Sequence, residues 1–145
     1  MARPTQVDPR GLRVAAAIST VVLALVLITP PPVSIALLVA QTAVFGIGAF
    51  VSLKASPYSL LFARFVRPRI GPPAELEDAR PPRFAQVVGL VFAALALIGF
   101  ALGAPAVGFT AVALALVAAL LNASIGLCLG CEMYLAWNRL RPIRV

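Results

Sequence analysis

The sequence contains no histidine, two cysteines and few charged residues. Without histidine the chain lacks the usual protein ligand of haem iron, copper and catalytic zinc. A zinc site made of four cysteines would need a dimer, so we predict no metal site. Charged residues make up 12% of the 145 residues, against about a quarter in a typical soluble domain. The chain therefore has too few charges to cover a soluble surface.

The composition instead indicates an integral membrane protein of one domain. Apolar residues make up 61% of the chain, which excludes a disordered protein, and the length allows at most one domain. The net charge of +7 would suggest nucleic acid in a soluble protein. In a membrane protein, basic residues usually lie in cytoplasmic loops that face anionic lipid. We therefore expect the lipid bilayer, and no nucleic acid, as a partner.

Four apolar segments are long enough to cross a bilayer, whose core of about 30 Å takes about 20 helical residues. They must be helices, because a lone strand leaves its backbone unsatisfied in lipid. The first is not expected to be a cleaved signal peptide, because no typical cleavage site precedes the proline turn. The sequence predicts an all-α, integral membrane four-helix bundle in a single domain, 1–145, with spans at about 12–29, 33–53, 84–102 and 106–137.

All the basic residues fall on one side of this four-span arrangement. Uncharged turns rich in proline or glycine join spans one to two and three to four. The N-terminal segment, the 54–83 loop and the C-terminal segment hold three, six and three of the twelve basic residues. By the positive-inside rule, both termini and the loop are cytoplasmic. We expect a multi-pass protein of the inner (plasma) membrane.

The 54–83 loop carries apolar residues at helical spacing, namely Tyr58, Leu61, Phe62 and Phe65, with Arg64 among them. This pattern is typical of a short helix at the membrane interface, and a continuation of span two is the alternative. The proline-rich, acidic segment that follows is expected to be extended. Salt bridges in a solvated loop explain its acidic residues better than a metal site does.

The two cysteines form a C-x-x-C motif, Cys128 and Cys131. This spacing suits an intramolecular disulfide, a sulfur relay or half of a metal site. The alternative is that both are small buried apolar residues. Glu132 is adjacent, and Asn122 precedes the motif by one to two helical turns, so both are candidate supporting residues. An interhelical hydrogen bond is the simpler interpretation of Asn122.

The depth of the pair and the course of the helix decide its chemistry. At a rise of about 1.5 Å per residue, the thiols lie at or just past the cytoplasmic edge of the apolar core, on the reducing side, so a permanent disulfide is not expected. An unbroken helix would place them at its negative end, which disfavours a thiolate. A break at Gly126 would let Cys128 open a new helix, which favours one. Gly126 and Gly130 equally suit close helix packing, so both arrangements stay open.

Three runs resemble a known family: S-P-Y-S-L-L-F-A-R (56–64), P-P-R-F-A-Q-V-V-G-L (81–90) and N-A-S-I-G-L-C-L-G-C-E-M-Y (122–134). They are similar to the small bacterial membrane proteins catalogued as domain of unknown function family 4395, over residues 8–134. The resemblance implies four spans, a cysteine pair near the end of the last span, and an association with thioredoxin-like and sulfurtransferase proteins. Some relatives carry further cysteines in a C-terminal tail. This chain ends R-P-I-R-V, which counts against an intramolecular thiol relay.

The leading functional hypothesis is thiol redox or sulfur handling at the cytoplasmic membrane face. In it Cys128 attacks and Cys131 resolves the mixed disulfide, while Arg83 or an arginine of the 64–69 cluster, such as Arg64, supplies a positive field. The partner is a thioredoxin-like or sulfurtransferase protein, or an anionic sulfur species. The alternatives are a non-catalytic subunit or scaffold of a larger membrane complex, and a small sulfur-anion transporter. The sequence identifies no cofactor and leaves open whether the protein is an enzyme.

Overall fold

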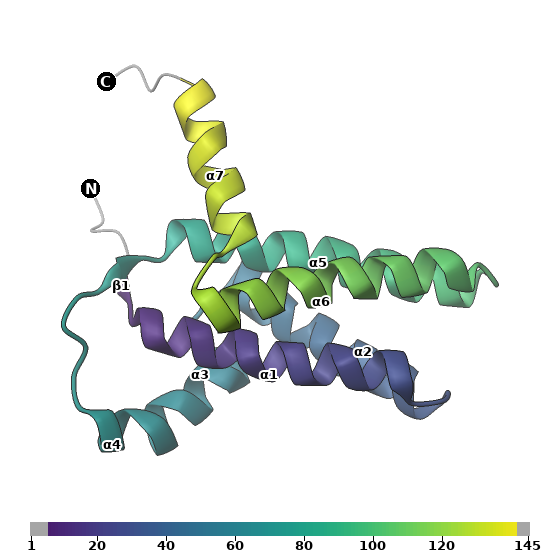
Figure 1. The fold of residues 1–145 in the computed structure, drawn as a ribbon, viewed down its shortest axis with the longest axis horizontal. Helices are drawn as coiled ribbons and strands as arrows, with labels where there is room; N and C mark the ends of the chain where they lie inside the picture. Colours follow the sequence, from purple (N-terminus) through teal and green to yellow (C-terminus); the bar gives the residue numbers. More distant parts are fainter. Residues whose placement is uncertain (1–5, 142–145) are drawn as a thin grey trace.

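The computed structural model describes residues 6–141 and confirms the predicted all-α bundle (Figure 1). Four helical segments within this range are long and apolar enough to cross a membrane. They run side by side and alternate in direction. Their bounds are α1 Pro9–Ile28, α2 Val33–Gly46 with the π-helical turn η1 Ile47–Val51, α5 Arg80–Ala101 and α6 Pro105–Ile125.

Prolines set the starts of these helices. A proline has no N–H to leave unpaired and its φ already suits a helix, so it is well placed in a first turn. Pro9 begins α1, Pro105 begins α6, and α5 also has proline in its first turn. Because of these starts, α1 and α5 begin three to four residues earlier than the sequence predicted. The end of the bundle at which α1 and α5 begin also carries the 54–83 loop, and we call it the basic end.

The centre of the bundle is packed from small and medium-sized apolar residues. The buried cluster comprises Leu23, Val26, Leu38, Phe45, Ala93, Ala96, Ala111, Val112 and Ala115. The outward faces of the same helices are also apolar, with Val21, Val91 and Val117 each more than half exposed. An apolar surface on all sides suits lipid, not water. The structure is therefore that of a multi-pass membrane protein.

One polar residue lies fully inside this apolar bundle. Gln41 has 0% exposure, and its amide donates to Ser19 Oγ at 3.1 Å and accepts from Tyr58 Oη at 2.6 Å. Burial raises the pKa of Tyr58 above its usual value of 10.0. Three elements are thereby joined by bonds that leave the buried amide satisfied, as a polar group in an apolar interior requires.

The helix predicted in the 54–83 loop is present. It runs through α3 Pro57–Leu61, η2 Phe62–Val66 and α4 Arg67–Ile70. The chain is then largely extended and includes a two-residue strand that the sequence did not predict, β2 Glu77–Asp78. This strand pairs antiparallel with β1 Gln6–Val7. Within this strand Asp78 accepts a 2.6 Å bond from Arg80, so this part of the acidic segment is salt-bridged as expected.

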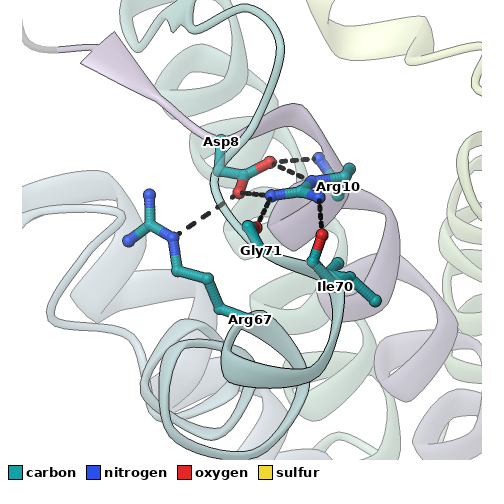
Figure 2. Close-up of polar contacts among 5 residues, drawn as sticks. All are labelled: Asp8, Arg10, Arg67, Ile70 and Gly71. Carbon is teal, nitrogen blue, oxygen red and sulfur yellow. Dashed lines mark hydrogen bonds and ion pairs between the residues drawn. The ribbon is translucent and has the colours of Figure 1, made fainter.

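A charged cluster fastens the start of α1 to the end of α4 (Figure 2). Asp8 is the N-cap of α1 and accepts from the backbone N–H of Arg10 at 2.9 Å. The Arg10 guanidinium binds the same carboxylate at 2.9 Å and donates to the Gly71 carbonyl at 2.8 Å. Arg67 approaches Asp8 to 3.8 Å. Because the Asp8 side chain is only 7% exposed, this cluster is better shielded from water than a surface ion pair.

The helix α7 Leu129–Leu140 stands across the direction of the four long helices (Figure 1). It packs on the start of α5, where the Tyr134 and Phe84 rings lie 5.8 Å apart. Gly130 is buried in this contact. A Cβ added there would lie 2.6 Å from both Cα and Cβ of Ala85. Because a backbone atom is in the way, only glycine allows α7 to pack this closely on α5.

We predict that the Asp8 carboxylate stabilises the fold in a pH-dependent way. The hydrogen bond from Arg10 lowers the pKa of Asp8 below its usual 3.8. The stabilisation is therefore fully present above the usual pKa of Asp8, which applies to the unfolded chain. It is lost as the pH falls through the lowered pKa of Asp8 in the folded protein. Asp8→Asn keeps the cap acceptor and removes the charge, so it should lose about 1 kcal/mol at pH 7 relative to wild type. In mild detergent, the thermal midpoints of wild type and Asp8→Asn should become more similar as the pH is lowered. An equal difference at pH 7 and pH 3 would contradict this role.

We predict that Gly130→Ala weakens the packing of α7. The expected loss is about 1–3 kcal/mol, the usual range for an overpacked contact. Gly46→Ala is the matched control, because a Cβ at Gly46 meets nothing within 4 Å and alanine has the higher helix propensity. Thermal midpoints and the rate of proteolysis within α7 provide the measurements. Equal values for the two variants would show that Gly130 is not a packing contact.

Candidate functional site

The chain breaks between α6 and α7, immediately before the cysteine pair. Gly126 ends α6 in the left-handed conformation, with φ 72°. Its N–H donates to the Asn122 carbonyl at 3.1 Å, and the N–H of Leu127 donates to the Leu121 carbonyl at 3.3 Å. This is how glycine commonly terminates a helix. The segment predicted at about 106–137 is therefore divided between α6 and α7, and of the two arrangements left open the broken one is present.

Arg13 of α1 holds the end of α6 in place. Its guanidinium donates to the carbonyls of Ala123 at 3.2 Å and Ser124 at 3.1 Å. These carbonyls lack helical N–H partners and form the negative end of the helix dipole. A positive charge on them reduces the negative potential of that helix end close to the cysteines. Sequence reasoning did not select Arg13, although the alternation of spans brings the start of α1 beside the end of α6.

Cys128 is the N-cap of α7. Its Sγ accepts a hydrogen bond from the backbone N–H of Cys131 at 3.2 Å. The two sulfurs are joined in a disulfide, with the Cα atoms 5.1 Å apart. Both residues are partly buried. The pair thus combines a sulfur at the positive end of a helix with a second sulfur within bonding distance. The expectation that the disulfide is not permanent in the cell concerns the redox environment and stays a prediction.

A cavity of about 390 Å³ extends from the cysteine pair into the bundle. It reaches Phe92 and Ala115, which lie about halfway along α5 and α6. Its walls are mostly apolar and come from α1, α2, α3, α5, α6 and α7. Cys128 and Cys131 both line it. A ligand in this space would lie beside both cysteines and between the membrane-spanning helices.

Two residues with side-chain amides line this cavity, Gln86 on α5 and Asn122 on α6, and the Gln86 amide also packs against Gly48 of η1. Among the described residues neither amide has a hydrogen-bond partner, and both residues are partly buried. Asn122 therefore lines the cavity that leads to the pair, and within residues 6–141 its side chain forms no interhelical hydrogen bond, the simpler interpretation of this residue. Ser124, by contrast, bonds back to the Leu120 carbonyl at 2.6 Å.

The other predicted supporting residues lie away from the cavity lining. Arg83 donates to the Ala49 carbonyl at 2.6 Å and to that of Phe50 at 3.3 Å, where it holds the end of η1. Arg64 lies 5.8 Å from the centre of the Phe65 ring and is exposed. Glu132 is exposed in the first turn of α7. Of the positive groups, it is Arg13 that shares the cavity with the cysteines.

Comparison with curated proteins and with solved structures gives no match. A family model described as domain of unknown function DUF4395 matches residues 7–139, nearly the whole chain. This match confirms the resemblance carried by the three sequence runs. The chain belongs to the DUF4395 family.

Proposed function

We propose that the protein carries out thiol–disulfide exchange at the membrane surface, with Cys128 as the attacking thiol and Cys131 as the resolving thiol. The observation that carries this proposal is the position of Cys128 as N-cap of α7, with the N–H of Cys131 directed at its sulfur. In the reduced protein this N–H and the positive helix end stabilise a thiolate on Cys128. Arg13 supports it by offsetting the negative end of α6.

The exchange proceeds in two balanced steps. The Cys128 thiolate attacks a disulfide of the partner, forms a mixed disulfide and releases one partner thiolate. The Cys131 thiolate then attacks Cys128 Sγ, closes the Cys128–Cys131 disulfide and releases the second partner thiolate. With a partner persulfide, Cys128 takes the outer sulfur and the second step releases hydrogen sulfide. The chemistry fits a thioredoxin-like or sulfurtransferase protein as partner.

We further propose that the basic end faces the cytoplasm, so that both chain termini and the 54–83 loop lie there, in the plasma membrane. The support is the distribution of charge. The arginines of α1, α4, α5 and α7 all lie near this end, whereas the turns at the other end, 29–32 and 102–104, carry no charge. Positive residues are retained on the cytoplasmic side. The cysteine pair then meets cytoplasmic partners.

A second candidate is a non-catalytic subunit of a larger membrane complex. The observation in its favour is the exposed apolar surface of α7, where Met133, Trp137 and Leu140 are 53%, 58% and 80% exposed. In that case the cysteines are structural. Function in cells would then survive replacement of both cysteines by alanine.

The exchange mechanism predicts different behaviour for the two cysteine variants. Cys131→Ser keeps the attacking thiol and should accumulate a mixed disulfide with a purified, oxidised thioredoxin, because the resolving step is absent. Cys128→Ser should accumulate none. Acid quenching, alkylation with a mass tag and non-reducing gels provide the measurement, with wild type before and after an oxidant or sulfide pulse as reference. The proposal is wrong if neither variant forms a mixed disulfide and the wild-type cysteine pair does not change between thiol and disulfide.

The orientation predicts which end an impermeant maleimide reaches in intact cells. In a background with both native cysteines changed to serine, Leu102→Cys should be labelled and Leu76→Cys should be labelled only after lysis. Both positions are exposed, at 78% and 47%, and lie at opposite ends of the bundle. The reverse pattern would place the cysteine pair outside and overturn the cytoplasmic assignment.

A further inference from the structure

We infer that the cavity between the membrane-spanning helices binds a quinone, and that this quinone exchanges electrons with the Cys128–Cys131 pair. The inference rests on the proposed function running in the opposite direction, because thiol–disulfide exchange is reversible. A reduced protein partner opens the Cys128–Cys131 disulfide, and the pair must then be reoxidised to return to its starting state. The second electron partner therefore has to reach the two sulfurs. The cavity leads to them from within the bundle.

The dimensions and walls of the cavity suit the ring of such a molecule. Its volume of about 390 Å³ falls within the range of pockets that enclose small organic ligands. Phe45, Val88, Phe92 and Leu114 supply apolar wall. The cavity reaches halfway along α5 and α6, so its occupant lies at a depth where the surroundings of the protein are lipid. A membrane-soluble ligand fits this position.

The two unpartnered amides suit the ring oxygens. Gln86 and Asn122 come from neighbouring helices and line the same cavity. Neither NH₂ group donates a hydrogen bond to another of residues 6–141, although the Gln86 amide also packs against Gly48. Polar groups in an apolar setting gain from an acceptor. The two carbonyl oxygens of a quinone are such acceptors, on an otherwise apolar ring. The Gln41 amide, by contrast, is already satisfied by Ser19 and Tyr58.

Other occupants fit the same features less well. A lipid acyl chain matches the apolar wall but offers the amides no acceptor and cannot take electrons. A sulfur anion needs positive charge, and the Arg13 guanidinium is already bound to the carbonyls of Ala123 and Ser124. The quinone alone among these matches the wall, the amides and the redox pair.

The electron balance closes with these two reactants. The Cys128 and Cys131 thiols lose two electrons and two protons and form one S–S bond. The quinone gains two electrons and two protons and becomes a quinol. The reduced protein partner supplies these two electrons to the pair through thiol–disulfide exchange. No further oxidant or reductant is needed.

The test uses the purified full-length protein in lipid nanodiscs, reduced and freed of reductant under anaerobic conditions. Decylubiquinone and menadione are the probes. Thiol loss by mass-tag alkylation and quinol formation by absorbance should proceed together, with one quinol for each disulfide. The Cys128→Ser variant gives the background rate. If the quinones oxidise the wild-type protein no faster than the Cys128→Ser variant, the inference is overturned.

Cavity variants separate binding in the cavity from reaction at the surface. Ala118→Phe fills the cavity, whereas Val117→Phe adds the same ring at a neighbouring exposed position of α6 that does not line it. Asn122→Leu and Gln86→Leu remove an amide and keep the size. We expect oxidation by quinone to slow by at least about tenfold in the cavity variants, the scale of a lost polar contact, and to be unchanged in Val117→Phe. Equal rates for Ala118→Phe and Val117→Phe would contradict a quinone in the cavity.

Exchange with thioredoxin distinguishes this inference from the proposed function. We expect the cavity variants to react with oxidised thioredoxin at the wild-type rate, which also shows that they are folded. If wild type exchanges with thioredoxin but is not oxidised by either quinone, the quinone inference fails and the exchange function stands. If wild type reacts with neither, both fail.

Discussion

The carbonyl groups that end the helices at the basic end of the bundle need hydrogen-bond donors, and three arginines supply them. Arg10 binds the carbonyls at the end of α4, Arg13 those at the end of α6, and Arg83 those at the end of η1. Each helix end carries partial negative charge and unpaired carbonyls, which are costly at the edge of a membrane. Three of the positively charged side chains thus bind carbonyl groups of the protein itself. The same bonds tie α1 to α4 and α6, and α5 to η1.

The position of the cysteine pair depends on the helix end that Arg13 holds. Because α6 stops at Gly126, the chain can turn and start α7 with Cys128 as its cap. Gly130 then lets α7 lie against Ala85 at the start of α5. These two glycines therefore have different roles. Gly126 adopts the left-handed backbone that ends α6, and Gly130 lacks the Cβ that would clash with Ala85. Together they place a sulfur at the positive end of a helix and beside the cavity.

The polar residues of the bundle fall into two groups with different physical consequences. Gln41 is buried with its partners and joins α1, α2 and α3. Gln86 and Asn122 line the cavity and have no hydrogen-bond partners for their amides among the described residues. A satisfied amide in an apolar core stabilises a fold, whereas an unsatisfied one beside a cavity has hydrogen-bonding capacity left for a ligand. Composition alone does not separate these groups, because all three residues are amides within apolar runs.

The sequence by itself determined the membrane class, the four apolar helices, the loop helix and the family, because each follows from local composition, periodicity or a contiguous motif. It also located the C-x-x-C motif. It did not decide whether the last segment breaks at Gly126, because glycine is compatible with both a helix end and close packing. Only the tertiary structure showed that Arg13 binds the end of α6 and that a cavity lies next to the cysteine pair. It also showed that Arg83 and Arg64 do not line this cavity. Those features depend on which helices lie side by side, and contacts between distant segments leave no local signal in one sequence.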